Sequence, residues 1–566
     1  MDLVKIKEDI YRYAIKNAFE HEGKADIGAV VSKIIALHPD VKTVMKDVMQ
    51  LVIVGVKQVN AMKAPDIESE FKKFESSYEL KPKPERQGLK KLADLGIELS
   101  EVVTRFAPNP NAPFHLGNAR AAILSYEYAK ANDGKFILRF EDTDPKIKKP
   151  IKDAERIFKE DLKWLGIVPD ETYFQSDRLE IYYEIIRKLI LMDKVYVCKC
   201  DVEEWRAKTH DSQECKCREL SKEEHMQRFD AMLSNELKQG QAVVRMKTDL
   251  YHQDLSVRDY WIARAIDNPE HERQGSKYFV WPAYNLASAV DDHEMGVTLI
   301  MRGQEHAQNE VKQRFMYKYL GWNYPKAIHF GRLKLEGIIL SKSRINEGIA
   351  NGEFSGYDDP RLGTIRALRR RGFQPEALKK LIEDVGTNTN DATVQSSKIE
   401  SLNKKIIDEK ADRFMFVENP TELDISFTPA KIVEFPLHQD FPERGSRVYE
   451  LSEGSQKFFV SKNDLDKLKQ GQIFRLRHAY NVKLTERGDF VSHAQCIGDT
   501  QMKESIFWAI ETTNVEIVMP DNKKIYGVAE KLLEEKEIGD IVQFEKLGYL
   551  RIDSKGKQIS LVLTQH

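Results

Sequence analysis

Several features that would place a protein in a membrane or outside the cell are missing from this sequence of 566 residues. No uninterrupted apolar run is long enough to cross a bilayer. The first residues carry acidic side chains and lack a small-residue cleavage site, which argues against a secretory signal. Cysteine is scarce, and an odd total of five favours reduced thiols over a disulfide framework. We expect a cytoplasmic protein with no membrane partner.

The chain also lacks a strong net charge, internal repeats and low-complexity tracts. Its 88 Lys and Arg nearly balance its 90 Asp and Glu, so a polyanionic partner would have to bind local basic patches. Hydrophobic residues make up 41% and charged residues 31%, a composition typical of a folded globular protein. The length predicts several domains rather than one core.

The N-terminal part of the sequence predicts helices. Over residues 1–85, apolar side chains such as Ile10, Ala14 and Ala18 recur at helical spacing. The segment ends in the Pro-containing stretch ELKPKPERQG, residues 79–88, which is typical of a linker. We therefore expect a separate helical N-terminal region.

The remainder of the chain changes its pattern twice. Strands alternate with helices in 86–195 and again in 281–345, which predicts a parallel α/β sheet interrupted by an insertion at 196–280. The next residues, 346–410, are helical again. From 411 to 566, short strands with frequent turn signals are typical of antiparallel barrels. The fold class predicted is multidomain α/β with a C-terminal β-barrel region.

A first candidate site is the loop RFAPNPNAPFHLGNAR, residues 105–120. Prolines stiffen the loop, and Gly117 stands where a helix would begin. A strand end followed by a helix N-terminus offers free N–H groups suited to phosphate, to which His115 and Asn118 would add donors. Taken alone, the pattern is better explained as a proline-rich turn with a surface histidine.

A second candidate site is GIILSKSRI, residues 337–345, more than 200 residues later. On a loop, Lys342 between Ser341 and Ser343 can place an ammonium and two hydroxyls around a triphosphate. Alone, this would be an exposed lysine in a polar loop. The two sites together, enclosing an α/β pattern with an insertion, make these simpler explanations less favourable.

The pair resembles the HIGH and KMSKS signatures of class I aminoacyl-tRNA synthetases. The blocks LRFEDTDP, YNLASAVDDHEMGVTLIMRGQEH and DDPRLGTIRALRRRGF are similar to those of glutamyl- and glutaminyl-tRNA synthetases. FPLHQDFPERGSR and the β-rich tail resemble the archaeal and eukaryotic branch. Three positions depart from the signatures, namely Ala112, Asn118 and Ile339. The resemblance is to archaeal-type glutamyl-tRNA synthetases, and it covers roughly residues 100–566.

The resemblance implies the fold and the reaction. It makes the α/β part a Rossmann-type catalytic domain, the insertion an acceptor-stem domain and the barrels an anticodon-binding region. The reaction implied is ATP + L-glutamate + tRNA(Glu) → glutamyl-tRNA + AMP + diphosphate, with Mg²⁺ and without a nucleophilic side chain. Charging of tRNA(Gln) as well is left open, and we expect a monomer. The alternatives are a glutaminyl-tRNA synthetase and a non-catalytic tRNA-binding protein.

The resemblance also implies site residues. His115, Asn118 and Lys342 would be catalytic. The implied ATP-binding residues are Pro108, His115, Gly117, Asn118, Ser341, Lys342 and Ser343. The implied amino-acid-binding residues are Arg105, Ala107, Asn109, Glu141, Tyr284, Ser288 and Arg302. The two arginines would hold the two substrate carboxylates, because bidentate Arg–carboxylate pairing reads such groups well, and Glu141 would accept the α-ammonium. Outside these motifs, ordinary ion pairs and a core tyrosine would explain the same residues.

Four cysteines lie in the insertion as two C-x-C pairs, Cys198 with Cys200 and Cys215 with Cys217. Four thiolates in two pairs fit tetrahedral Zn²⁺, although reduced thiols in a charged loop remain the alternative. We interpret the fifth thiol, Cys496, as a core residue. The sequence therefore predicts a zinc site in the insertion.

Two groups of arginines are candidates for tRNA contact. They are Arg366, Arg369, Arg370, Arg371, Arg475 and Arg477. The first four lie on a predicted helix after the second signature. The last two alternate with aromatic residues, a mixture suited to phosphate contact and base stacking. For any one of them, a solvated face is the simpler explanation.

Overall fold

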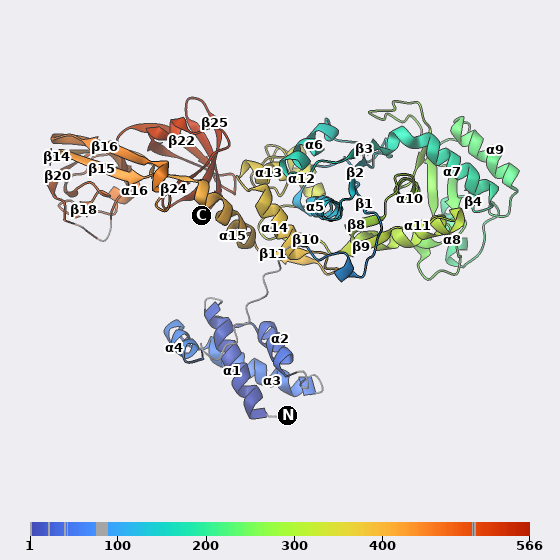
Figure 1. The fold of residues 1–566 in the computed structure, drawn as a ribbon, viewed down its shortest axis with the longest axis horizontal. Coiled ribbons are helices and arrows are strands. Elements are labelled where there is room, and N and C mark those ends of the chain that lie inside the picture. The colour runs from blue at the N-terminus through green and yellow to red at the C-terminus, as the bar shows by residue number, and fades with distance from the viewer. Residues whose placement is uncertain are drawn as a thin grey trace. The chain divides into compact units, whose positions relative to one another are not determined.

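The computed structural model describes residues 3–20, 23–38, 41, 44–74, 89–500, 502 and 505–566. The chain forms two compact units, Met1–Gln87 and Gly88–His566 (Figure 1). The linker predicted at 79–88 lies outside the described residues. No helix among the described residues is long and apolar enough to cross a membrane.

The first unit is helical, as predicted. Its helices are α1 (Leu3–Glu20), α2 (Ile27–Leu37), α3 (Met45–Asn60) and α4 (Ala64–Phe74). Asp26 caps α2 by accepting a hydrogen bond from the Ala29 backbone N–H. Ile10, Ala14 and Ala18 are buried together with the valines on the inner face of α3. The helical spacing in the sequence therefore marks the core of this unit.

The second unit begins with a five-stranded sheet in the order β3-β2-β1-β8-β9 (Figure 1). All four pairings are parallel. The strands are β1 (Val103–Phe106), β2 (Lys135–Phe140), β3 (Glu171–Phe174), β8 (Leu299–Gly303) and β9 (Lys326–Phe330). The helices between them are α5 (Leu116–Lys130), α6 (Ala154–Trp164), α7 (Leu179–Leu191), α10 (Tyr284–Glu294) and α11 (Ala307–Leu320). The parallel α/β prediction is confirmed.

This strand order fixes where a ligand can bind. The order reverses between β1 and β8, and ligands of open α/β sheets bind outside the carboxyl ends of the strands at such a switch point. Arg105 lies near the end of β1, Arg302 near the end of β8, and Glu141 directly follows β2. The fold therefore gathers these three predicted residues at one edge of the sheet.

The insertion forms its own antiparallel sheet in the order β4-β5-β6-β7. Its elements are β4 (Val195–Cys198), α8 (Val202–His210), α9 (Lys222–Leu233), β5 (Val243–Met246), β6 (Trp261–Ala265) and β7 (Val280–Pro282). The run AVVRMK, residues 242–247, contains β5. The first strand of the sheet begins at Val195, one residue before the predicted insertion of residues 196–280. The last strand ends at Pro282, two residues after it.

Helices follow the catalytic sheet, together with a short parallel ribbon of β10 with β11. These elements are β10 (Leu333–Leu335), α12 (Lys342–Ala350), α13 (Ile365–Arg370), α14 (Pro375–Val385), β11 (Ala392–Val394) and α15 (Ser396–Ile407). In Figure 1, α13, α14 and α15 run from the catalytic sheet to the C-terminal strands. They lie within residues 346–410, for which the sequence predicts a helical connector.

The C-terminal region contains two barrel-like sheets, as predicted. A seven-stranded sheet comprises β12 (Asp412–Phe414), β13 (Phe416–Glu418), β22 (Thr512–Val518), β23 (Lys524–Glu530), β24 (Ile541–Phe544), β25 (Gly548–Lys555) and β26 (Ile559–Gln565). A six-stranded sheet comprises β14 (Pro420–Thr428), β17 (Gly454–Ser461), β18 (Ile473–Arg475), β19 (Asn481–Glu486), β20 (Val491–Gly498) and β21 (Trp508–Ala509). The chain enters the first sheet, builds the second, and then completes the first.

A hairpin of β15 (Lys431–Pro436) with β16 (Ser446–Leu451), and the short helix α16 (Lys462–Leu465), complete this region. A buried carboxylate ties the hairpin to the seven-stranded sheet. Glu530 Oε2 accepts hydrogen bonds from Arg447 Nη1 at 2.5 Å and from the Met415 backbone N–H at 2.7 Å, while the Tyr449 hydroxyl bonds the other oxygen. Arg447 and Glu530 are both almost fully buried.

Replacing Glu530 with Ala would leave the Arg447 guanidinium buried without its main counter-charge. Breaking a buried pair in this way costs about 3–5 kcal/mol, so the free energy of unfolding of the C-terminal region should fall by that amount. Calorimetry of the full chain measures it. Lys457→Ala, which breaks an exposed pair with Glu422 in the same region, should cost at most about 1 kcal/mol. An equal fall in the free energy of unfolding of the two variants would contradict this account.

Candidate functional site

A cavity of about 1610 Å³ opens at the carboxyl ends of the catalytic strands. It is far larger than one amino acid, and it extends from the parallel sheet to residues of the insertion such as Trp205 and Trp261. Eleven residues predicted from the sequence line it. They are Arg105, Ala107, Pro108, Asn109, His115, Gly117, Asn118, Glu141, Tyr284, Arg302 and Ser341. The structure therefore brings most of the predicted site together.

The first signature places an uncharged imidazole at a helix N-terminus. His115 is the N-cap of α5, and its Nδ1 accepts from the Asn118 backbone N–H at 3.4 Å. Burial, with a smaller contribution from nearby Lys342, lowers the pKa of His115 to about 4. At neutral pH the ring is therefore neutral, and its proton resides on Nε2, free to donate to a ligand. A Cβ on Gly117 would lie 2.9 Å from His115 Cε1, so glycine makes room for the ring.

A short segment, residues 361–365, hydrogen-bonds to both signatures. The Leu116 N–H donates to the Gly363 carbonyl at 3.0 Å, and the Gly363 N–H donates to the Ile339 carbonyl at 2.8 Å. A Cβ on Gly363 would lie 2.3 Å from Leu340 Cδ2, so any other residue here would have to displace the Leu340 side chain. The two signatures, more than 200 residues apart, are thus held in fixed register by one strip of backbone.

The second signature differs in detail from its prediction. Lys342 was expected on a loop, but it is the first residue of helix α12, with Ser341 at the N-cap. Its ammonium group contacts Asn111 Oδ1 in the first-signature loop, a partner that sequence reasoning missed. Lys342 and Ser343 do not line the cavity. Ser341 has the extended backbone of an N-cap residue, but its side chain makes no capping hydrogen bond, so the motif alone does not reveal where the helix begins.

Two buried arginines share one carboxylate beneath the cavity. Arg105 Nε donates to Asp292 Oδ1 at 3.0 Å, and Arg139 Nη1 donates to the same oxygen at 2.7 Å. Burial alone would raise the pKa of Asp292, but these two guanidiniums hold it below its ordinary value. Sequence reasoning missed Arg139 and Asp292. Both stand inside the quoted motifs, yet only the fold shows that β1, β2 and α10 bring them into contact.

Glu141 faces the cavity beside this network. Arg139 Nη2 lies 3.4 Å from Glu141 Oε1. Burial raises the pKa of Glu141 to about 7, against the opposing effects of Arg139 and Arg105. This carboxyl is therefore poised between its two charge states near neutral pH, and a cation beside it would favour the ionised form.

Ser288 does not line the cavity, contrary to the substrate-binding role predicted for it. It is completely buried on α10, and Arg139 Nη2 donates to its hydroxyl at 3.3 Å. The next acid on this helix, Asp291, accepts from Arg178 Nε at 2.7 Å and from the Tyr182 hydroxyl at 2.7 Å. Ser288 thus supports the arginine network from behind the cavity wall.

Arg302 has a different environment from Arg105. Its Nε, Nη1 and Nη2 atoms donate to His329, Gln313 and Tyr324 at 3.1, 3.1 and 3.0 Å. Among the residues that the structure describes, no carboxylate forms an ion pair with it. The guanidinium is almost fully buried and lines the cavity, and the acid whose charge acts on it, Asp292, is already paired with Arg105 and Arg139.

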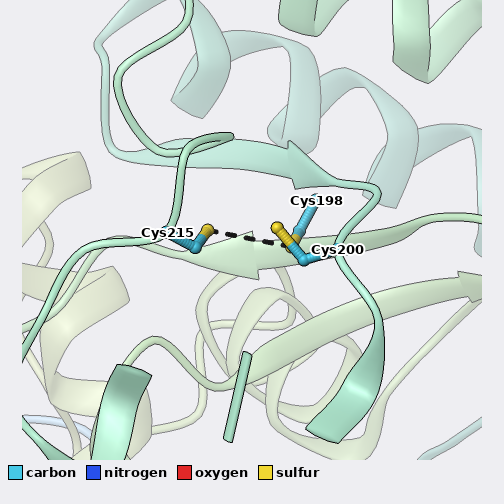
Figure 2. Close-up of side chains that lie close together, drawn as sticks. All are labelled: Cys198, Cys200 and Cys215. Carbon is cyan, nitrogen blue, oxygen red and sulfur yellow. Dashed lines mark hydrogen bonds between the residues drawn. The ribbon is translucent and has the colours of Figure 1, made fainter. Parts of the chain in front are cut away.

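The four cysteines of the insertion converge. Figure 2 shows Cys198, Cys200 and Cys215 with their sulfur atoms close together, and these three sulfurs lie within 4.8 Å of one another. The Sγ–Sγ distance is 3.9 Å from Cys198 to Cys215 and 3.7 Å from Cys200 to Cys217. Cys217 Sγ also accepts from the Lys199 backbone N–H at 3.4 Å. Cys496, expected in the core, is only partly buried in β20.

The arginines predicted to contact tRNA are not equivalent. Arg371 is only 5% exposed and donates to the Thr564 carbonyl at 3.1 Å, so it ties the connector to the C-terminal sheet and is inaccessible to phosphate. Arg370 pairs with Asp553 at 2.8 Å, and Arg366 with Glu160 at 2.8 Å. Arg369 is exposed. Inclusion of Arg371 among the tRNA contacts is therefore wrong.

Both C-terminal arginines are also paired within the protein. Arg475 Nη2 lies 2.9 Å from Asp499 Oδ1. Arg477 Nη2 lies 2.7 Å from Glu545 Oε2, and its guanidinium stacks 4.9 Å from the Phe507 ring centroid. Glu545 follows a strand of the seven-stranded sheet, so Arg477 links the two sheets.

Three family models match consecutive parts of this chain. The model for the catalytic domain of tRNA synthetases class I (E and Q) matches residues 101–409. Two models for the anti-codon binding domain of the same family match residues 411–497 and 499–553.

Curated relatives match nearly the whole chain. A glutamate–tRNA ligase of Pyrococcus abyssi is 45% identical over 560 residues, which cover 97% of this chain and 98% of the relative. A glutamate–tRNA ligase of Methanothermobacter thermautotrophicus is 41% identical, with 98% of each chain covered. A solved glutamate tRNA ligase of Elizabethkingia meningosepticum, in complex with its amino acid, is 22% identical, with a TM-score of 0.40 over 54% of this chain and 70% of that one. The chain belongs to the class I tRNA synthetases of the E and Q family.

Proposed function

We propose that this protein is a glutamate–tRNA ligase. It would form glutamyl-adenylate from ATP and L-glutamate and then transfer the glutamyl group to tRNA(Glu). The observation that best supports glutamate as the substrate is the guanidinium of Arg302, which lies in the cavity and is bound only by neutral side chains. The curated relatives that match nearly the full chain carry the same activity in their names.

The charges of the buried network beside Arg302 favour an anionic amino acid. Three arginines, Arg105, Arg139 and Arg178, are offset by Asp291, Asp292 and ionised Glu141. Arg302 then adds one unmatched positive charge. Glutamate with its α-ammonium carries one net negative charge, which balances it, whereas glutamine would leave a buried charge unpaired at a high cost in free energy. This argument speaks against the alternative of a glutaminyl-tRNA synthetase.

The ATP side of the cavity is built for phosphate. The neutral His115 Nε2–H, the N-terminus of α5 and the Lys342 ammonium would stabilise charge on the phosphate oxygens, while Asn118 and Gly117 shape the loop. Pro108, Ser341 and Ser343 would complete this subsite. Mg²⁺ enters with ATP as part of the substrate. The substrate carboxylate is ionised at neutral pH and attacks the α-phosphate directly, so positioning outweighs acid–base catalysis.

The amino-acid side would use the arginines for the two carboxylates. Arg302 would hold the side-chain carboxylate, Arg105 the α-carboxylate and Glu141 the α-ammonium. Ala107, Asn109 and Tyr284 would complete the pocket wall. The tRNA terminal ribose would then attack the mixed anhydride, with AMP as the leaving group. A protein that only binds tRNA would not need this combination, which speaks against a non-catalytic protein.

The domains and the remaining partners follow from this function. Residues 196–280 would receive the acceptor stem, and 411–566 the anticodon, with Arg369 as the most accessible arginine of the connector. Charging of tRNA(Gln) is also proposed, and we expect a cytoplasmic monomer.

The four cysteines would hold one Zn²⁺ ion. A tetrahedral site with Zn–S bonds of about 2.3 Å has S–S edges of about 3.8 Å. The distances of 3.9 Å from Cys198 to Cys215 and 3.7 Å from Cys200 to Cys217 fit such edges. A bound zinc ion would fix the insertion structurally and would take no part in the reaction.

The proposed activity is tested with purified tRNA(Glu) and tRNA(Gln). ATP–pyrophosphate exchange is measured with tRNA present, and glutamate is compared with glutamine. Glutamate should be activated at least about a hundredfold better, because glutamine leaves Arg302 unpaired. Preferential activation of glutamine would overturn the proposal. Charging of both tRNAs with glutamate would support the broader specificity.

Lys342→Ala should lower kcat for charging about 100-fold, because it removes a donor to the charge that develops on phosphate. The free energy of unfolding should change little, since the side chain is partly exposed. Arg344→Ala is the matched control on the same helix. Its guanidinium is exposed and pairs with Glu353, so charging should be unaffected. Unchanged charging by Lys342→Ala would refute its role.

The pH dependence of charging should report Glu141. Its pKa of about 7 means that the ionised form, which accepts the α-ammonium, is lost as pH falls through 7. Between pH 8 and pH 6, kcat/KM for glutamate should therefore fall about tenfold. His115, with a pKa of about 4, does not titrate in this range. Glu141→Gln should be less active, and its kcat/KM should not fall between pH 8 and pH 6. If the same fall is seen in this variant, another group causes it.

Metal analysis of the purified chain should find about one zinc ion per molecule. Cys198→Ser should lower both the zinc content and the melting temperature, because a structural zinc site contributes directly to folding. Cys496→Ser removes a thiol outside the cluster and should retain the metal. If the zinc-free wild-type protein had the same melting temperature as the zinc-containing protein, the assignment would be contradicted.

A further inference from the structure

The three protein partners of Arg302 share one property, which is that none carries a negative charge. His329 accepts the Nε–H through its Nε2 atom at 3.1 Å, so that nitrogen is unprotonated. Burial and then Arg302 lower the pKa of His329, which keeps the ring neutral. The Tyr324 hydroxyl accepts from Nη2 and itself donates to Gln313 Oε1 at 2.8 Å. The guanidinium is thus held in place by neutral acceptors.

Gln313 is the most deeply placed of these partners. It lies on α11 with no exposed surface, behind the wall of the cavity rather than in it. Its Oε1 accepts from both Arg302 Nη1 and the Tyr324 hydroxyl. The orientation of the amide follows from chemistry, because a guanidinium can only donate hydrogen bonds.

That orientation has a cost. With Oε1 turned to Arg302 and Tyr324, the Gln313 Nε2 group is buried and has no hydrogen-bond partner among the described residues. A buried, unpaired polar group costs about 1–3 kcal/mol. Glutamate at this position would accept both hydrogen bonds and would leave no N–H unpaired. Stability therefore does not explain the amide.

The surrounding acids leave the Arg302 charge unmatched. Glu310 lies 3.6 Å from His329 Nε2 but pairs with Arg314 at 2.6 Å. Asp292 is bound to Arg105 and Arg139. The contrast with Arg105, which has a carboxylate partner at 3.0 Å, shows that the fold can supply an acid to a buried arginine but supplies none here.

We propose that Gln313 is a specificity-determining positioning residue. It orients Arg302 without neutralising it, so that the guanidinium takes its counter-charge from the side-chain carboxylate of the amino acid. An acid at position 313 would supply that charge from the protein and remove the preference for an acidic substrate over its amide. This inference rests on the proposed function, since it presumes that Arg302 reads the side chain of glutamate.

Gln313→Glu tests this directly in the full-length protein. Exchange with ATP, pyrophosphate and tRNA yields kcat and KM for glutamate and for glutamine. KM for glutamate should rise about 10- to 100-fold with a smaller change in kcat, since a charge-assisted contact is lost. Activation of glutamine should not fall, so the glutamate-to-glutamine ratio of kcat/KM should drop at least about tenfold.

Two control variants separate charge from packing. Gln313→Met keeps the site neutral but removes the oxygen that accepts from Arg302. Activity should therefore fall, while the glutamate-to-glutamine ratio of kcat/KM stays within about threefold of the wild-type value. Gln308→Glu adds the same charge at an exposed position of α11 and should leave kcat and KM unchanged for both amino acids. His329→Glu is a second charge variant, which places an acid on the Nε side of Arg302 and should lower the ratio as Gln313→Glu does.

The outcomes are distinct. The inference would be overturned if folded Gln313→Glu or His329→Glu kept the wild-type glutamate-to-glutamine ratio of kcat/KM. It would also be overturned if Gln313→Met lowered that ratio as much as Gln313→Glu does. If Gln313→Glu does not fold, His329→Glu and Gln313→Met still decide, because the inference requires a low ratio in the first and a retained ratio in the second. Failure of the wild-type protein to activate glutamate would instead reject the proposed function itself.

Discussion

Asp292 is the residue on which the geometry of the cavity depends. Its carboxylate joins Arg105 of β1 and Arg139 of β2 to helix α10, across the switch point of the parallel sheet. Arg139 in turn contacts Glu141 and Ser288. Because this network is buried, each member is held in one orientation, and its charges nearly cancel. Arg302 stands outside that balance, which leaves one positive charge for a ligand to match.

The nucleotide side depends on a different constraint, namely backbone hydrogen bonds. Residues 361–365 connect the first signature to the second through Gly363, which fixes the position of one loop relative to the other. Lys342 already contacts Asn111 across this junction. Under the proposed function, the charged network would bind the amino acid and the backbone frame would position ATP. Both lie at the carboxyl ends of β1 and β8, which is where an open α/β sheet binds its ligands.

Local patterns in the sequence predicted the parts of this structure that depend on local physics. Strand and helix periodicity located the parallel sheet, the helical region and the C-terminal barrels, and the motifs located His115, Glu141 and Arg302. Contacts between distant segments were not predictable in this way. Arg139, Asp292 and Gln313 look like ordinary polar residues until β2, α10 and α11 meet. For the same reason Ser288 and Arg371 were misjudged, since burial of a polar side chain is decided by the packing of remote elements.

The central claim is that Arg302 takes its counter-charge from the amino-acid side chain. A crystal structure with a non-hydrolysable glutamyl-adenylate analogue tests it most directly. The account predicts that the side-chain carboxylate binds Arg302, that Gln313 Oε1 still accepts from Arg302 Nη1, and that the phosphate lies near His115. A side-chain carboxylate bound away from Arg302, or an Arg302 turned toward an acid of the protein, would contradict it.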